Sequence, residues 1–251
     1  LDKVERIEVD NDSVTGMSIN FPLSVQPGKW VLQMDGMGKS YGDKQLYKEV
    51  NLTVGRGEKI ALLGANGMGK STLLKQVMAK IEGEGVVEYG HNVNIAYFAQ
   101  DQAESLDKNK TVYETVDEIA KDDIRKSLRQ VLGAFLFRGE DVDKKVGVLS
   151  GGERTRLALC QLLLSPSNFL ILDEPTNHLD IQSKEVLKSA LKNYEGTFIV
   201  VSHDREFLDN LTNRIWDIEN KSLKIHHFGV MDFLKRKMEL MQLDGNKSIE
   251  K

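Results

Sequence analysis

Eight consecutive residues, Gly64 to Ser71, constrain this chain more than any other stretch, because they fit the pattern G-x-x-x-x-G-K-[S/T] in full. They follow the apolar run Ile60 to Leu63 and open a stretch with helical character. Glycines between a strand and a helix let successive backbone N–H groups point inward, and the helix N-terminus adds partial positive charge. The motif therefore predicts a phosphate-binding loop.

Two residues of this loop have predicted roles. Lys70 is expected to reach the outer phosphates of a nucleotide, and the Ser71 hydroxyl is expected to bind Mg²⁺. The alternative is an ordinary glycine-rich turn, which the placement of Lys and Ser at the helix start disfavours. Upstream, Tyr41 offers a ring that could stack on a base, although a half-exposed tyrosine without a ligand is at least as common.

A second run, Phe169 to Leu172, is continuously apolar, as in a central parallel strand, and ends in Asp173 and Glu174. Open α/β sheets bind ligands at the carboxyl ends of their strands, so these acids are expected beside the phosphate-binding loop. Asp173 is then a Mg²⁺ ligand, usually through water, and Glu174 can orient or deprotonate the attacking water. Two solvated acids at a strand end are the alternative.

The segment Leu149 to Glu153 precedes a predicted helix and supports two interpretations. Ser150 and Glu153 have the spacing of a capping box. Gly151 and Gly152 would each cost roughly 1 kcal/mol relative to Ala in a helix, so a cap alone does not call for them. A phosphate that approaches the helix N-terminus closely would call for them. From spacing alone, the cap and a second anion site are equally good interpretations.

Composition excludes several classes of protein. With 40% hydrophobic and 29% charged residues, the chain has the mix of a globular protein of one domain or two lobes. No run approaches the roughly 18 apolar residues of a membrane-spanning helix, so no membrane insertion is expected. A single cysteine, Cys160, excludes a disulfide framework and fits a cytoplasmic location. A net charge of −4 disfavours binding of nucleic acid by overall charge.

From Lys29 onwards, apolar runs alternate with helical periodicity, which predicts an α/β fold with a largely parallel sheet. Residues 103–148 lack a strand pattern and predict a helical lobe inserted into the sheet domain, which reaches about residue 165 with the helix that follows. Strands are expected near 30–34, 50–54, 60–63, 94–98, 169–172, 198–201 and 214–218. Helices are expected near 70–81, 112–120, 124–137, 151–164, 183–194 and 206–211.

The two ends of the chain differ from its middle. Residues 1–28 are acidic, hold two of the four prolines and predict a linker, and the missing initiator Met suggests a piece of a longer protein. Residues 231–251 predict an amphipathic helix and tail. Its stripe is expected to pack on the same domain rather than on a partner, and consists of Met231, Leu234, Met238 and Met241. The basic run 235–237 is expected to be solvated.

Together these motifs resemble, in order and over roughly residues 29–230, the nucleotide-binding domain of ATP-binding cassette (ABC) proteins. Gln100, after an apolar run, matches the glutamine that touches Mg²⁺ and the attacking water in that family. His203, after Val200 to Ser202, matches the histidine that contacts the γ-phosphate. The resemblance implies an ABC-type P-loop NTPase fold: a mostly parallel central sheet, an antiparallel β portion near the N-terminus and an inserted helical subdomain.

The resemblance also implies ATP hydrolysis, with ATP and Mg²⁺ bound. It assigns catalysis to Glu174, His203 and Gln100, and the metal to Ser71, Gln100 and Asp173. The residues implied to contact ATP are Tyr41, Gly64, Asn66, Gly67, Gly69, Lys70, Ser71 and Thr72. The residues implied to cover the ATP of a second cassette are Ser150, Gly151 and Gly152.

The closer resemblance is to the ABC-F class. Residues 149–156 read L-S-G-G-E-R-T-R, whereas transporter cassettes more often have Gln after the two glycines. Residues 174–180 read E-P-T-N-H-L-D, whereas transporter cassettes often have Ser-Ala-Leu-Asp in this motif. This class implies a second cassette in the same chain, or a homodimer of the isolated domain, with the ribosome and tRNA as partners in translation. The linker-like residues 1–28 indicate the second, C-terminal cassette. The alternatives are an ATPase subunit of a membrane transporter and a nucleotide-sensing module with negligible turnover.

Overall fold

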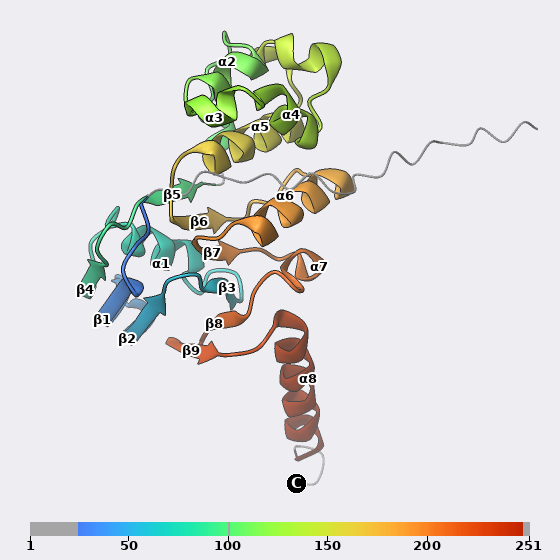
Figure 1. Ribbon diagram of the computed structural model, residues 1–251. Coiled ribbons are helices and arrows are strands. Elements are labelled where there is room, and N and C mark those ends of the chain that lie inside the picture. Colours follow the sequence, from blue (N-terminus) through green and yellow to red (C-terminus); the bar gives the residue numbers. More distant parts are fainter. Residues whose placement is uncertain (1–24, 100, 248–251) are drawn as a thin grey trace, which may run out of the picture.

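The computed structural model describes residues 25–99 and 101–247. The strands are β1 (Trp30–Tyr41), β2 (Lys44–Gly55), β3 (Lys59–Gly64), β4 (Glu84–Tyr89), β5 (Ile95–Phe98), β6 (Phe169–Asp173), β7 (Thr197–Val201), β8 (Arg214–Glu219) and β9 (Ser222–His226). The α-helices are α1 (Lys70–Val77), α2 (Val112–Asp117), α3 (Asp122–Arg125), α4 (Leu128–Ala134), α5 (Gly151–Leu164), α6 (Ile181–Asn193), α7 (Arg205–Leu208) and α8 (Val230–Lys247). A helical lobe lies at one end of the sheets and α8 extends from the other (Figure 1).

The central sheet has six strands in the order β5-β6-β7-β3-β8-β9, of which only β9 is antiparallel to its neighbour. Every residue of β6 and β7 is buried. Leu170 and Leu172 face the helices α5 and α6, whereas Phe169 and Ile171 face α1 and the second sheet. Both faces are covered, which is why these strands have continuous apolar sequences. The predicted α/β fold is confirmed.

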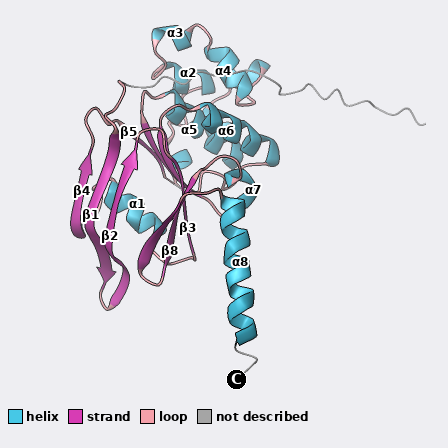
Figure 2. Cartoon of the chain, turned by 60° about the horizontal axis from the view of Figure 1, so that its bottom comes forward, coloured by secondary structure: helices cyan, strands magenta, loops and turns pink. Residues whose placement is uncertain are grey.

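The second sheet is antiparallel, in the order β2-β1-β4, and confirms the antiparallel portion that the resemblance implied. Helix α1 lies between the two sheets (Figure 2) and contributes Leu73, Leu74 and Val77 to their shared core. β1 and β2 have 12 residues each, longer than predicted. β4 was missed, because only Val87 of its six residues is even half buried and no alternation is visible in the sequence.

The helical lobe (top of Figure 1) comprises residues between β5 and α5, with 3-10 turns at Gln102–Ser105, Gly139–Asp143 and Val146–Val148. The single helix predicted over 124–137 was wrong, because α3 and α4 are separate short helices. The Ser127 hydroxyl bonds to the carbonyl of Ile124 between them, at 3.2 Å. Leu136 adopts a left-handed φ of 64°, which ends the helical run.

Two further helices end earlier than predicted for the same reason. α1 ends at Val77 rather than near residue 81, since Ala79 has a φ of 54°. α7 ends at Leu208 rather than 211, since Asn210 has a φ of 56°. Such left-handed residues break the helical hydrogen bonds without a glycine or proline to announce them. Throughout residues 25–99 and 101–247, every helix is too short or too polar to span a bilayer.

The buried face of helix α8 overlaps the predicted stripe only at Leu234. Met231 and Met238 are 55% and 57% exposed, so these two residues of the predicted stripe do not pack on the domain, whereas Leu234 packs against its core. Val230 and Phe233 are buried instead, on the face that Lys237 shares. The Lys237 ammonium lies 3.0 Å from Asp217 and 3.3 Å from Glu219 on β8, and these ion pairs turn that face inward. The prediction was wrong for the two methionines because it treated Lys237 as a solvated residue. Met241 lies outside the residues whose side chains are described.

Candidate nucleotide site

The phosphate-binding loop leaves the end of β3 and enters α1 directly. Gly64 has a φ of 151°, and a Cβ there would lie 2.9 Å from the carbonyl oxygen of Ile218. Gly69 has a φ of 98°, and a Cβ there would lie 3.1 Å from Leu46. Only glycine fits these positions, so the loop can curl tightly between the strand and the helix.

Lys70 holds its charge inside this loop. The residue is 9% exposed, and its ammonium donates to the carbonyl oxygens of Gly64 at 2.8 Å and Ala65 at 3.3 Å. Burial lowers the pKa of Lys70, while Glu174 and Asp173 oppose that shift. The loop thus presents a partly desolvated cation together with the N-terminus of α1, an arrangement suited to phosphate oxygens.

Asp173 faces the same loop from the end of β6. The Ser71 hydroxyl donates to its Oδ1 at 3.3 Å. Asp173 is 5% exposed, and burial raises its pKa against the effects of Ser71, Lys75 and Lys70. Oxygen donors of this kind suit Mg²⁺. No group of three or more His, Cys, Asp or Glu suited to a metal occurs in the described part of the chain, so the chain's donors fit a Mg²⁺ that is also bound by water and phosphate oxygens.

Glu174 and His203 lie together at the ends of β6 and β7. His203 Nε2 is 3.4 Å from Glu174 Oε1, and the His203 backbone N–H donates to Oε2 at 3.4 Å. The Glu174 side chain is 13% exposed, and its pKa is raised by burial and lowered by His203. Its backbone has a left-handed φ of 51° and is fixed by an N–H bond to the Val201 carbonyl at 2.9 Å. Strained backbone of this kind is common at functional sites.

The remaining nucleotide residues are less defined. Gln100 lies outside the described residues. Tyr41, at the end of β1, is 55% exposed, with the Lys39 ammonium 5.0 Å from its ring centroid, so base stacking stays a prediction. Near the exposed Asn66 and Gly67, a hollow of about 450 Å³ is bounded by the β1–β2 and β8–β9 turns. Its cations, Lys44 and Lys221, were missed because they come from turns far apart in the sequence.

The capping box at the start of α5 is present. Glu153 N–H donates to Ser150 Oγ at 3.3 Å, and Ser150 N–H donates to the Glu153 carboxylate at 2.7 Å. The two glycines differ. A Cβ on Gly152 would lie 2.8 Å from the carbonyl oxygen of His178, whereas one on Gly151 would meet nothing within 4 Å. The close approach of the His178 carbonyl therefore explains why residue 152 is a glycine. Of the two glycines, only Gly151 leaves space open beside the helix N-terminus.

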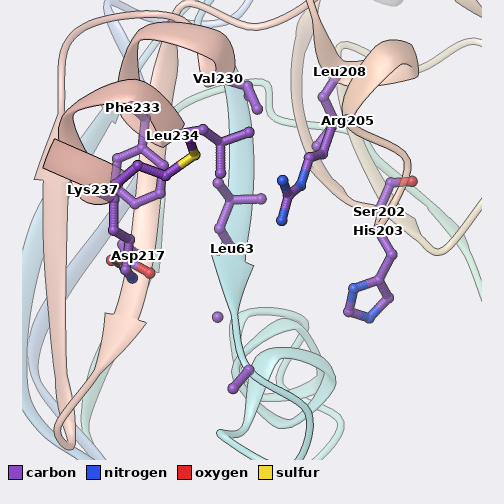
Figure 3. Close-up of a pocket in the computed structure, with 13 residues that line it drawn as sticks. Leu63, Ser202, His203, Arg205, Leu208, Asp217, Val230, Phe233, Leu234 and Lys237 are labelled. Atoms are coloured by element: carbon purple, nitrogen blue, oxygen red, sulfur yellow. Dashed lines mark hydrogen bonds and ion pairs between the residues drawn. The ribbon is translucent and has the colours of Figure 1, made fainter. Parts of the chain in front are cut away.

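A pocket of about 350 Å³ lies between the phosphate-binding loop, the segment after β7 and α8. Figure 3 shows Arg205 and His203 on one side of it and the Phe233–Lys237 face of α8 on the other. Gly64 and Ala65 line it as well, so α8 shares a wall with the nucleotide site. Sequence reasoning did not place Arg205, Asp217 or Lys237 here, because the pocket combines three separate segments.

The fold and the cluster of Lys70, Ser71, Asp173, Glu174 and His203 define a P-loop nucleoside triphosphatase. Residues 47–177, just over half of the chain, match the family described as ABC transporter. The chain belongs to this family of ATP-binding cassette proteins, and its domain is an ABC ATPase domain.

The relatives confirm the ABC-F resemblance. ABC transporter F family member 5 of Arabidopsis thaliana is 47% identical over 211 residues, which are 83% of this chain and 30% of the relative. ABC transporter F family member 2 of the same organism is 43% identical over 226 residues, 89% of this chain and 33% of the relative. The chain thus spans about a third of the length of these two relatives.

A solved structure confirms the fold. It is a dimeric ATP-binding cassette in a post-hydrolysis state with ADP and Pi, and it aligns with a TM-score of 0.65 at 23% sequence identity. The alignment covers 78% of this chain and 98% of that one.

Proposed function

We propose that this chain is one cassette of an ABC-F protein, which binds ATP with Mg²⁺ and hydrolyses it when a second cassette closes over the site. The observation that carries this proposal is the convergence of Lys70, Ser71, Asp173, Glu174 and His203 at the carboxyl ends of β3, β6 and β7. A buried cation, a hydroxyl–carboxylate pair and a carboxylate beside a histidine supply the parts that phosphoryl transfer to water requires.

Each residue then has a role. The loop amides and Lys70 bind the outer phosphates, and Ser71 and Asp173, with Gln100, hold Mg²⁺. When bound, Mg²⁺ would neutralise the charge that develops on the phosphate oxygens. Glu174 orients the attacking water and accepts its proton, and a pKa raised by burial makes it a better base. His203 contacts the γ-phosphate, and Tyr41 stacks on the adenine.

The signature residues Ser150, Gly151 and Gly152 serve a different nucleotide, the ATP of the second cassette. The open N-terminus of α5 at Gly151 supports this assignment, because no described part of the chain lies where a side chain of residue 151 would begin. An ATP clamped between a phosphate-binding loop and a helix N-terminus joins the two cassettes. Loss of the γ-phosphate weakens that clamp.

The translation role rests on relationship rather than on the site. The ABC-F relatives and the motifs L-S-G-G-E-R-T-R and E-P-T-N-H-L-D support a second, C-terminal cassette of a cytoplasmic protein that acts on the ribosome and tRNA. The full-length protein carrying Glu174→Gln should therefore cosediment with ribosomes in ATP and not without nucleotide. Absence of that enrichment would favour the ATPase subunit of a transporter instead.

The need for a second cassette can be tested on this chain alone. Turnover per chain should rise with chain concentration over a wide dilution series, because the lone cassette carries two half-sites. Fast turnover that does not depend on concentration would contradict the proposed pairing.

A further inference from the structure

Arg156 joins three elements that the sequence separates. It lies in the second turn of α5, and its side chain is only 11% exposed. Its Nη1 donates to Ser183 Oγ at 2.8 Å and lies 4.0 Å from Asp180 Oδ2, both at the start of α6. Its guanidinium also stacks over the Phe137 ring of the helical lobe, 4.9 Å from the centroid. One side chain of α5 therefore contacts both the helical lobe and the segment that follows Glu174.

A second contact holds the same two elements together. The backbone of Gly152 approaches the His178 carbonyl so closely that a Cβ would lie 2.8 Å from that oxygen. His178 has a left-handed φ of 65°. Two residues on, Asp180 caps α6 by accepting from Ser183 N–H at 2.7 Å. Residues 178–183 are thus fixed to the first turns of α5 at two points.

The other end of this loop is fixed to the hydrolytic residues. Thr176 and Ser202 hydroxyls lie 2.8 Å apart, and both residues are buried. Glu174 is held by the Val201 carbonyl and by His203. A continuous set of contacts therefore connects residues 150–152 with Glu174. In the proposed function, residues 150–152 face the nucleotide of a partner cassette and Glu174 faces the nucleotide of this chain.

A contribution to stability alone does not explain why residue 156 is an arginine. Its Nε is buried without a hydrogen-bond partner, and the guanidinium is desolvated for one good hydrogen bond and a longer ion pair. An apolar side chain of similar length could pack on Phe137 without that desolvation. What an apolar side chain could not supply is a directional bond to Ser183.

We propose that Arg156 is a positioning residue that makes the first turns of α5 and residues 174–183 move as one body, so that engagement of the signature with a second cassette sets the orientation of Glu174. This inference rests on the proposed function, since it assumes two nucleotide half-sites in one chain. Each site would then report its occupancy to the other through the chain itself.

The test compares Arg156→Lys and Arg156→Met with Arg129→Lys. Arg129 is the surface control, because it also pairs with an acid, Asp143 at 3.6 Å, and stacks on an aromatic ring, Tyr113 at 5.4 Å, but is 64% exposed. Both Arg156 variants should lower kcat roughly tenfold at saturating ATP and chain, while KM for ATP changes less than about twofold. Arg129→Lys should keep the parental kcat. Thermal midpoints near the parent value in Arg156→Lys would separate positioning from a merely structural role.

Amide hydrogen exchange gives a second readout that does not need turnover. Exchange at residues 177–183 in the nucleotide-free chain should be faster in Arg156→Met and unchanged in Arg129→Lys. If the parent chain lacks turnover at every concentration, the proposed function fails while the exchange experiment still tests the contact. Parental kcat in both Arg156 variants, or unchanged exchange at 177–183, would overturn the inference.

Discussion

The two halves of the candidate site are built in opposite ways. The phosphate-loop half gathers residues from three strands, and burial shifts the pKa values of Lys70, Asp173 and Glu174. In the signature half, the helix cap is local: Ser150 and Glu153 satisfy each other within one turn, and Gly151 stays open. Contacts between distant segments thus organise the phosphate-loop half, which is assigned to hydrolysis. A capping box within one helix turn organises the start of the signature half, which is assigned to a partner's nucleotide. Each prediction below separates these two halves.

The largest effect is expected from Glu174→Gln in the phosphate-loop half. The amide keeps the shape of the side chain but cannot accept a proton, so kcat should fall by at least about 100-fold while ATP affinity stays within about threefold. Removal of a desolvated carboxylate should leave the thermal midpoint unchanged or higher. Turnover and nucleotide binding measured on the same preparations check this; parental turnover would show that the role is misassigned.

Next in size is Gly152→Ala, where the two halves touch. A Cβ 2.8 Å from the His178 carbonyl forces the loop or the helix to shift, so the free energy of unfolding should fall by about 1–3 kcal/mol. Gly151→Ala is the matched control, since its Cβ meets open space and alanine in a helix should stabilise by about 0.5–1 kcal/mol. Denaturant unfolding of both variants checks the contrast. Equal stability of the two would remove the argument for a close contact.

Ser150→Ala should have a smaller effect. Loss of the hydroxyl leaves the Glu153 N–H without its cap and should cost about 1 kcal/mol. Ser150→Thr, which keeps the acceptor, should remain close to the parent in the same unfolding experiment. A cost well above that of a single helix cap would mean that Ser150 also supports distant structure.

The smallest effect is a pH dependence of opposite sign in the two halves. Burial raises the pKa of Glu174 above its ordinary value of 4.5, whereas hydrogen bonds with Ser150 lower that of Glu153. The folded chain therefore holds the proton of Glu174 more tightly than the unfolded chain, and Glu174 contributes more stability as pH falls from neutral towards 4.5. Glu153 contributes stability above 4.5 and loses it as pH falls through its lowered folded pKa.

Unfolding free energies of the parent, Glu174→Gln and Glu153→Gln across this pH range test those signs. The unfolding free energy of the parent minus that of Glu174→Gln should start at zero or below near neutral pH and rise on acidification. The unfolding free energy of the parent minus that of Glu153→Gln should be positive near neutral pH and fall on acidification. Two differences with the same slope would contradict the assigned burial.

The same contrast explains how far the sequence could be interpreted. The phosphate-binding loop, the acids after β6 and the capping box follow from short patterns, because their requirements are met by neighbours in the chain. Gly152 looked like one of a pair of glycines open to a ligand, and only the structure shows that His178 occupies the space beside it. No local pattern reports an approach between segments 26 residues apart in sequence.

The buried face of α8 could not be predicted from the sequence, because it depends on ion pairs between residues far apart in the chain. The buried face of α8 includes Lys237, a residue that a sequence pattern counts as solvated, because its partners Asp217 and Glu219 lie on β8. β4 was invisible for a different reason: it is an edge strand that pairs only with β1 and leaves most of its side chains exposed. Hydrophobic periodicity finds elements that bury a face within one core, and it misses those that are held by charge or by backbone pairing alone.

The place of β7 in the sheet has a mechanical consequence. β3 and β6, which deliver Ser71 and Asp173, are not neighbours, because β7 lies between them. The two strands are therefore two strand spacings apart, roughly 10 Å, with a relative rotation of roughly 45° from the sheet twist. The phosphate-binding loop and the start of α1 cross that distance and bring the Ser71 hydroxyl within 3.3 Å of Asp173 Oδ1. The distance between Ser71 and Asp173 therefore depends on how β7 orients the strands on either side of it. The side chains of β7 are wholly buried, and none of them touches a nucleotide in the proposed arrangement. A substitution among them that rotates one strand against its neighbours is nevertheless expected to change turnover, because it would move Asp173 relative to Ser71.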